Sequence, residues 1–312
     1  MRLGVLDLGS NTVHLLLVDA HYGAAPIPAS KLKMPLRLSE HLKDDGSIDK
    51  AAVDQLVDFI ERGQQLAEDM GATDIMAFAT SAIREAANGE DVIDRVRKDT
   101  GLGIEVLSGE DEARMTFLAA RRWFGWSSGR ILLLDIGGGS LELASGDGEE
   151  PDIAESLPLG AGRMTRDFLA GDPPSPESVR TLRKHARASI AEVVGRLRRV
   201  GEPRVAVATS KTFKQLARIG GAASSSEGIH VRRVLSADDV HEIVPRLAGM
   251  SAAQRGKIPG VSEGRSEQMV AGAIVAEAAM DLLEIDELVI CPWALREGII
   301  LNRMDRLGLD DA

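Results

Sequence analysis

The chain is poor in aromatic residues, in cysteine and in positive charge, and each shortage excludes a class of protein. Aromatic residues make up 3% of the 312 residues, so an extended stacking surface for single-stranded nucleic acid is not expected. Cys291 is the single cysteine, which excludes an internal disulfide and fits a reducing compartment. The net charge of −11 argues against a general polyanion-binding surface.

Long apolar runs are also missing. No uncharged stretch reaches the roughly 18 residues of a membrane span, since even Val270–Leu283 carries Glu277 and Asp281. The apolar run that starts at Leu3 meets Asp7 at once, which is not the pattern of a signal peptide. We therefore expect a cytoplasmic protein with no membrane or nucleic-acid partner.

One pattern is present twice. Arg2–Leu15 reads RLGVLDLGSNTVHL, and Arg130–Leu143 reads RILLLDIGGGSLEL in the same register. In each copy an apolar run ends in an aspartate, Asp7 or Asp135, and a Gly-rich turn and a second apolar run follow. This order predicts a strand, a tight turn and an antiparallel strand. Two copies, one in each half, predict two like-folded domains that face each other across a phosphate-binding cleft.

The residues of both turns are suited to phosphate oxygens. Glycine lets the backbone approach a ligand closely, and N–H groups and hydroxyls in such a turn form an anion cradle. An aspartate beside a phosphate is unfavourable unless a cation lies between them, so Asp7 and Asp135 imply Mg²⁺ or a similar divalent cation. The predicted phosphate-binding residues of the two turns are Ser10, Asn11, Gly137, Gly138, Gly139 and Ser140.

Hydrophobic periodicity extends the duplication over both halves. Each half reads βββαβαβα, which predicts an α/β fold with mixed sheets covered by helices. We expect domains at 1–124 and 125–312, a hinge at Trp123–Gly129, and a C-terminal helix (293–312) that could complete the first domain. The expected strands are 2–7, 12–19, 74–79, 104–107, 131–135, 140–145, 152–157, 204–208 and 287–291, with an extended stretch to about 38. The expected helices are 49–69, 89–99, 110–124, 176–199, 236–249, 264–283 and 293–306, with a short one near Lys211.

Five motifs follow one another along the chain: Asp7–Asn11 (DLGSN), Ala79–Arg84 (ATSAIR), Ser108–Arg114 (SGEDEAR), Asp135–Glu142 (DIGGGSLE) and Ala294–Gly298 (ALREG). In order and spacing they resemble the exopolyphosphatase and guanosine pentaphosphate phosphatase (Ppx/GppA) family. The resemblance implies a duplicated actin-like, ribonuclease H-like ATPase fold around a central cleft, in a short two-domain form that often pairs as a homodimer. It also implies a role in phosphate metabolism and the stringent response.

Glu112 is the candidate that activates water. From its position alone it could equally be one of three acidic residues that complement the dipole of a first helical turn. The resemblance favours catalysis, because Glu112 precedes Ala113-Arg114 as the family's catalytic glutamate does. Glu110 and Asp111 keep the capping interpretation.

Asp135 and Glu142, on the two strands of one hairpin, suit metal coordination together with Asp7. Their alternative is a solvated hairpin tip. The first copy has His14 where the second has Glu142, and we expect His14 to be a packed, hydrogen-bonded residue of the strand.

Basic residues are expected to hold the phosphate chain. Arg84 follows a strand at its carboxyl end, where a guanidinium can bind phosphate oxygens in bidentate fashion. Lys211, with Lys214 one turn along, stands in the equivalent turn of the second half, in place of a glycine usual in the family. It disfavours a nucleoside there and could supply charge, or be an exposed lysine at a helix start. Arg265 and Arg296 are further candidates.

The residues and the resemblance together favour an exopolyphosphatase that hydrolyses terminal orthophosphate from inorganic polyphosphate, with short chains preferred. The alternatives are hydrolysis of the 5′ γ-phosphate of guanosine pentaphosphate, a kinase of the same superfamily, and a sensor that binds polyphosphate or an alarmone (guanosine penta- or tetraphosphate) without turnover.

Overall fold

The computed structural model describes residues 1–21, 25–36, 38, 41–43 and 45–310, and side chains as far as residue 307. The expected extended stretch to about 38 and the helix end at 312 include residues 22–24, 37 and 311–312, which lie outside the described residues. The chain divides into two compact units, which are Met1–Met115 with Leu295–Ala312, and Thr116–Ala294. This division falls before the expected boundary at 124/125 and groups the C-terminal helix with the first unit.

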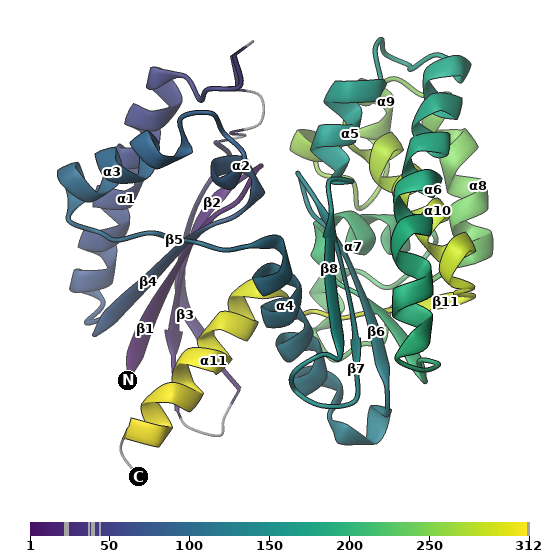
Figure 1. The fold of residues 1–312 in the computed structure, drawn as a ribbon. Helices are drawn as coiled ribbons and strands as arrows, with labels where there is room; N and C mark the ends of the chain where they lie inside the picture. Colours follow the sequence, from purple (N-terminus) through teal and green to yellow (C-terminus); the bar gives the residue numbers. More distant parts are fainter. Residues whose placement is uncertain (22–24, 37, 39–40, 44, 311–312) are drawn as a thin grey trace. The chain divides into compact units, whose positions relative to one another are not determined.

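The first unit is built on a five-stranded sheet with the order β3-β2-β1-β4-β5 (Figure 1). β1 pairs antiparallel with β2 and parallel with β4, so the sheet is mixed as expected. Its strands are β1 (Arg2–Leu8), β2 (Val13–Asp19), β3 (Ile27–Met34), β4 (Asp74–Ala79) and β5 (Glu105–Val106). Its helices are α1 (Lys50–Asp69), α2 (Ser81–Arg84), α3 (Gly89–Thr100), the start of α4 (Gly109–Phe124) and α11 (Leu295–Asp310).

Both faces of this sheet are buried. Leu6 and Leu8 of β1 pack with α1 and α3, whereas Leu3 and Val5 pack with α11. α1 and α3 lie on one side of the sheet and α11 on the other (Figure 1). Asp49 is the N-cap of α1, and its carboxylate accepts a hydrogen bond from the amide of Ala52 at 2.7 Å. A strand buried on both faces reads as a continuous apolar run, which is why β1 is recognisable in the sequence.

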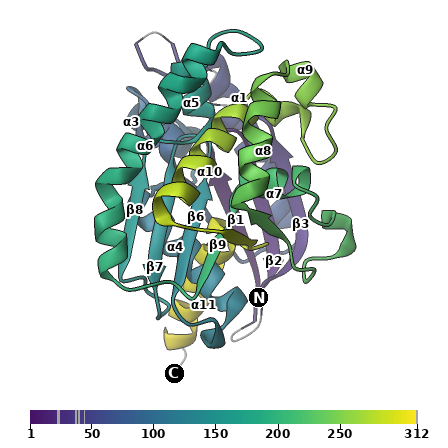
Figure 2. The ribbon, with the colours of Figure 1, turned by 90° about the vertical axis from the view of Figure 1, so that its right-hand side faces the viewer.

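The second unit is built on a six-stranded sheet with the order β10-β11-β9-β6-β7-β8. α10 is buried along Met269–Met280 and packs against α5, α6 and α8 (Figure 2). A helix that is apolar on all sides is central rather than amphipathic. The strands are β6 (Ile131–Ile136), β7 (Leu141–Gly146), β8 (Ile153–Leu157), β9 (Val205–Ala208), β10 (Val234–Ser236) and β11 (Glu287–Ile290). The helices are α5 (Ala161–Phe168), α6 (Pro176–Arg199), α7 (Ser210–Ile219), α8 (Ala237–Ala248), α9 (Ala252–Arg255) and α10 (Met269–Leu283).

The long elements match the expected ones, and the differences lie in short elements. α2, α5, α9 and β10 were not predicted, because three to eight residues carry too little periodicity to be recognised. The expected helix 264–283 is split, since a 3₁₀ turn at Glu263–Arg265 precedes α10. Two further 3₁₀ turns are Trp126–Ser128 and Ser225–Glu227. Among the described residues, none of the helices is both long and apolar enough to cross a membrane.

Candidate phosphate and metal site

The two predicted hairpins are present and share one geometry. Asp7 lies opposite His14 in the β1–β2 pair, and Asp135 lies opposite Glu142 in the β6–β7 pair. Each turn is closed by the amide of its first glycine. Gly9 donates to the carbonyl of Thr12 at 3.2 Å, and Gly137 donates to the carbonyl of Ser140 at 2.9 Å. The duplication read from the sequence is therefore a duplication of backbone structure.

The Gly137–Ser140 turn is held from one side by α5. The amides of Ala161 and Arg163 donate to the carbonyls of Gly137 and Gly138, each at 3.0 Å. Nε of Arg163 donates to the carbonyl of Gly139 at 2.8 Å. In a trans peptide the N–H points opposite to the carbonyl of the same peptide unit. The N–H groups of Gly138, Gly139 and Ser140 therefore all point away from α5, which is the orientation that the predicted anion cradle requires.

Glycine is required where α5 meets this turn. A Cβ on Gly160 would lie 2.3 Å from the backbone N and C atoms of Gly139, closer than any real contact. The helix can bind the turn's carbonyls because its N-cap has no side chain. The cradle thus depends on a second glycine segment, Gly160–Gly162, that the sequence analysis did not assign to the site.

Asp135 is surrounded by groups that fix it in place. The Thr209 hydroxyl, which is fully buried, donates to the Asp135 carboxylate. Burial lowers the pKa of the Arg265 guanidinium, and the charge of the Asp135 carboxylate opposes that shift. The two side chains therefore interact electrostatically. Across the hairpin, Glu142 is 4% exposed and accepts a hydrogen bond from the Ser156 hydroxyl at 3.0 Å. The alternative interpretation, in which Glu142 lies on a solvated hairpin tip, is not compatible with so buried a carboxylate.

The Asp135–Glu142 pair fits a hard divalent cation. Two carboxylates opposite each other on one sheet face repel unless a cation lies near them. Mg²⁺ commonly takes one or two carboxylates and completes its octahedron with waters and substrate phosphate. In the part of the chain that the structure describes, no group of three or more His, Cys, Asp or Glu side chains is placed to hold a metal by itself.

Asp7 has a different environment from Asp135. Nε of Arg296, in the first turn of α11, lies 4.0 Å from its carboxylate. Burial raises the pKa of Asp7, Arg296 opposes the shift, and Glu297 adds to it. Both ring nitrogens of His14 are buried and have no hydrogen-bond partner among the described residues, so the expected hydrogen bond is wrong. Arg296 is thus beside a carboxylate rather than isolated for phosphate.

The turn of the first unit is buried as well. Ser10 and Asn11 are 7% and 6% exposed, and the hydroxyls of Ser10 and Ser81 lie 3.1 Å apart. Ser81 belongs to α2, so the Gly9–Asn11 turn and the segment after β4 are joined by side chains. Two predicted motifs, Asp7–Asn11 and Ala79–Arg84, therefore meet at one edge of the sheet.

Glu112 and Arg84 form a buried ion pair. Nη1 of Arg84 donates to the Glu112 carboxylate and also to the carbonyl of Leu107 at 2.6 Å. The Glu112 side chain is 9% exposed and that of Arg84 is 24% exposed. The neighbouring acids act locally, because Asp111 makes reciprocal hydrogen bonds with Ser108 and Glu110 pairs with Arg114 on the exposed side. Glu112 is thus the one acidic residue of this turn that is directed inward.

The lysines of α7 differ from each other. Lys211 is exposed on the first turn, in keeping with either of its two interpretations. Lys214 donates to the carbonyl of Pro292 at 2.9 Å, so its expected availability to a phosphate chain is not supported.

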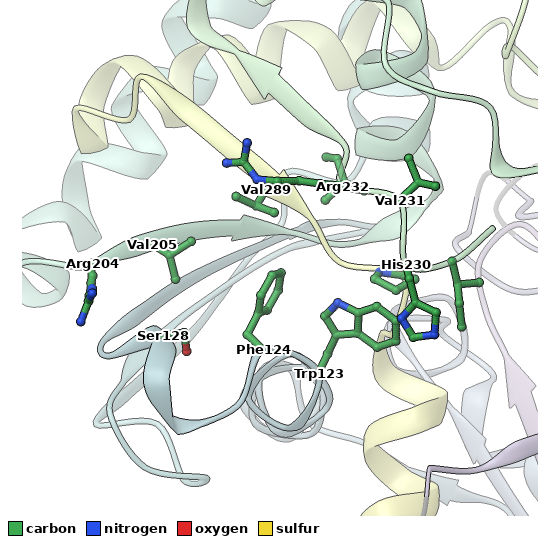
Figure 3. Close-up of a pocket in the computed structure, with 12 residues that line it drawn as sticks. Trp123, Phe124, Ser128, Arg204, Val205, His230, Val231, Arg232 and Val289 are labelled. Atoms are coloured by element: carbon green, nitrogen blue, oxygen red, sulfur yellow. The ribbon is translucent and has the colours of Figure 1, made fainter. Parts of the chain in front are cut away.

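A separate cavity of about 430 Å³ lies within the second unit and contains none of the predicted site residues. Trp123 and His230 stack at one side of it, with ring centroids 5.2 Å apart (Figure 3). The Trp293 ring meets Trp123 edge-on at the same distance. These aromatics pack together at the predicted hinge, except Trp126, which is 68% exposed.

Sequence reasoning did not assign roles to Thr209, to Arg163 or to Gly160–Gly162. The sequence did hold a signal for Arg163 and Gly160–Gly162. It is the segment LGAGR after β8, in which two closely spaced glycines are followed by an arginine. Thr209 carried no signal of its own, because its role depends on strand register.

The duplicated fold, the turn amides directed away from α5 and the paired carboxylates are the features expected of a phosphate-handling protein of the actin-like class. The sequence model of the Ppx/GppA phosphatase family matches residues 17–307. Exopolyphosphatase 1 of Mycobacterium tuberculosis (strain ATCC 25618 / H37Rv) is 54% identical over 305 residues, which cover 98% of this chain and 89% of that protein. The chain belongs to the Ppx/GppA phosphatase family.

More distant relatives agree with this assignment. Guanosine-5′-triphosphate,3′-diphosphate pyrophosphatase of Vibrio vulnificus is 28% identical over 313 residues, covering 98% of this chain and 60% of that protein. An exopolyphosphatase structure from Cytophaga hutchinsonii superposes with a TM-score of 0.87 at 23% identity, covering 98% of both chains. The family member from Aquifex aeolicus gives 0.83 at 24% identity, covering 99% of both chains. The last two comparisons show that the fold is shared along the whole chain.

Proposed function

We propose that this protein is a divalent-metal-dependent exopolyphosphatase that removes terminal orthophosphate from inorganic polyphosphate. The observation that carries the proposal is the Gly137–Ser140 cradle, whose three N–H groups are oriented by α5. The high identity to proteins named Exopolyphosphatase 1 supports the substrate. A preference for short chains, homodimer formation and a cytoplasmic location remain predictions from the sequence.

The proposed reaction is hydrolysis of one phosphoanhydride bond. Water oxygen bonds to the terminal phosphorus, the P–O bond to the remaining chain breaks, and the products are orthophosphate and a chain one phosphate shorter. Glu112 orients the water and takes its proton, while Arg84 holds the Glu112 carboxylate and contributes positive charge. Ser10 and Asn11 bind phosphate oxygens together with the cradle, Arg265 and Lys211.

The proposed metal ligands are Asp135 and Glu142, with Asp7 as a third for which Arg296 competes. When bound, Mg²⁺ neutralises charge on the phosphate oxygens. Thr209 and Ser156 keep the two carboxylates of the second unit in fixed orientations.

The test is orthophosphate release with Mg²⁺ from short polyphosphate, long polyphosphate and guanosine pentaphosphate in parallel. Wild type is compared with Glu112→Gln and with the matched control Glu110→Gln, which changes an exposed acid of the same helical turn. We expect Glu112→Gln to lower turnover by about 10²–10⁴ with KM nearly unchanged, the usual effect of a lost general base. Glu110→Gln should behave as wild type.

Each other outcome identifies an alternative. Faster release from guanosine pentaphosphate than from both polyphosphates would assign the activity named for the Vibrio relative. Tight binding of a substrate without release from any of the three would make the protein a sensor. Phosphate transfer from ATP that requires an acceptor other than water would make it a kinase. A wild-type rate in Glu112→Gln would remove that residue from the mechanism.

A further inference from the structure

The strand–turn–helix segment that follows each hairpin is also duplicated. Ala79-Thr80-Ser81 follows β4, and Ala208-Thr209-Ser210 follows β9. The two threonines have the same backbone conformation, with φ −113° and ψ −156° at Thr80 and φ −114° and ψ −157° at Thr209. Neither side chain caps the helix that follows. By sequence, backbone and position in the fold, Thr80 and Thr209 are counterparts.

The strands that carry these threonines pair in different registers. In the first unit Ala79 lies beside Leu8, the residue after Asp7. The same register in the second unit would place Ala208 beside Ile136, the residue after Asp135. Ala208 instead lies beside Leu134, two positions earlier on β6. Relative to β6, the turn after β9 therefore lies two residues nearer the N-terminal end of the strand than the turn after β4 does relative to β1.

This slip changes which side chain lies next to the aspartate. Phe78 lies beside Asp7, whereas Thr209 follows Ala208 directly and comes level with Asp135. The Thr209 amide donates to the carbonyl of Leu134 at 3.0 Å, which fixes the residue against β6. The Thr209 hydroxyl donates to the Asp135 carboxylate. The Thr80 hydroxyl instead faces the carbonyl of Leu8 at 3.5 Å.

The backbone next to Thr209 is held in an uncommon conformation. Ser210 has φ +69°, one of two non-glycine residues with positive φ in the described chain, and its counterpart Ser81 is not among them. A residue with a Cβ rarely adopts this left-handed conformation, because its Cβ crowds the following carbonyl oxygen. The second unit thus keeps a strained turn where the first does not, immediately after the residue that reaches Asp135.

We propose that Thr209 is a positioning residue that orients Asp135 to bind the divalent cation of the phosphate site. Its hydroxyl donates to the carboxylate and restricts how that carboxylate turns, as outer-shell partners of metal ligands do. The proposal rests on the proposed function, since Asp135 is a metal ligand only there. It adds that the two-residue slip of β9 is what makes Asp135, rather than Asp7, the principal metal ligand.

The test measures Mn²⁺ binding directly by electron paramagnetic resonance, on the full chain with inorganic phosphate present and no polyphosphate. The variants are Thr209→Val, which removes the hydroxyl at nearly constant shape, Thr209→Ser, which keeps it, and Asp135→Ala. Thr80→Val is the matched control, because it makes the same change at the counterpart turn. Thermal unfolding of each variant shows whether the fold is retained.

We expect Thr209→Val to weaken Mn²⁺ binding by about 10-fold or more, the range for outer-shell partners of metal ligands. Thr209→Ser should restore most of the affinity, and Thr80→Val should leave it unchanged. If Thr209→Val bound Mn²⁺ as wild type does while Asp135→Ala lost affinity, the proposed role of Thr209 would be overturned and the metal site would stand. Wild-type affinity in Asp135→Ala would overturn the proposed metal site itself. Equal losses in Thr209→Val and Thr80→Val would mean that the effect is structural.

Discussion

The hairpins of the two units have the same backbone and different surroundings. Both aspartates end a strand before a Gly-rich turn that is closed by the same backbone hydrogen bond. Asp7 has Phe78 beside it and Arg296 near it, whereas Asp135 has Thr209 and Arg265. The difference shows that duplication preserved the strand pair and that the flanking elements gave each copy its chemistry.

The turns differ in the same way. In the second unit α5 binds the carbonyls of the turn and directs its amides outward. In the first unit the turn is instead held by a contact between the hydroxyls of Ser10 and Ser81. The second turn is therefore fixed through its backbone carbonyls, as the proposed anion cradle requires, whereas the first is fixed through side chains.

Among changes that compare the two hairpins, the largest effect is expected where the cradle is pushed out of shape. Gly160→Ala places a Cβ 2.3 Å from Gly139, so the turn or α5 must move. Displacement of a binding group by about 1 Å can lower a rate about 10²-fold. We expect a loss of that size in phosphate release with the fold retained. Gly195→Ala is the control, since a Cβ there meets no atom within 4 Å and the position is inside α6. Wild-type rates in Gly160→Ala would mean that the cradle does not bind substrate.

A second experiment separates the two aspartates by metal dependence. Asp135→Asn should raise the Mg²⁺ concentration for half-maximal phosphate release by about 10–100-fold. Asp7→Asn should raise it less, because Arg296 already lies near the Asp7 carboxylate. Titration of both variants with Mg²⁺ gives the comparison. Equal shifts would show that the two hairpins contribute alike and that their different surroundings do not matter.

A third experiment concerns the position at which the two hairpins differ most in sequence. His14→Leu removes two buried nitrogens that have no partner among the described residues. An unsatisfied buried polar group costs about 1–3 kcal/mol, so we expect the free energy of unfolding to rise by about 1 kcal/mol. Urea denaturation measures the change, with His14→Gln as the control that keeps polar atoms in place. A loss of stability would show that the imidazole is hydrogen-bonded in solution.

The smallest effect is the pH dependence of stability at Asp7. Its pKa is raised in the folded protein, so the contribution of Asp7 to stability is full below its ordinary pKa and is lost as pH rises through the folded pKa. Asp7→Asn cannot titrate, so with EDTA present its Tm should exceed that of wild type near pH 8 and approach it near pH 4. We expect a gain under about 1 kcal/mol. A Tm advantage that grows toward acid pH would contradict the assigned shift.

Much of the fold could be predicted because the long elements carry strong local signals. The apolar runs of β1 and β6 end at Asp7 and Asp135 within one residue of the observed strand ends. α1 has a capping residue before it and a glycine with φ +69° after it. The inward direction of Glu112 was not visible in the sequence, where Glu110, Asp111 and Glu112 look alike, and the family resemblance selected it.

What could not be predicted depends on pairing between distant segments. Ala79-Thr80-Ser81 and Ala208-Thr209-Ser210 look equivalent in the sequence, yet a two-residue difference in strand register gives them different neighbours. The same holds for Arg296, which is separated from Asp7 by most of the chain and lies near it through α11. Register and long-range packing are set by the whole sheet and leave no local pattern.

The packing of α11 also governs when the first unit can be completed during synthesis. Leu3, Val5, Leu16 and Val18 lie in one cluster with Ile299, Ile300 and Met304, so the face they form is covered by the end of the chain. About 180 residues separate Met115 from Leu295. At roughly 5–20 residues per second, a ribosome needs about 9–36 s to cross that interval. During this interval the nascent chain exposes an apolar sheet face, which is the kind of surface that a chaperone binds.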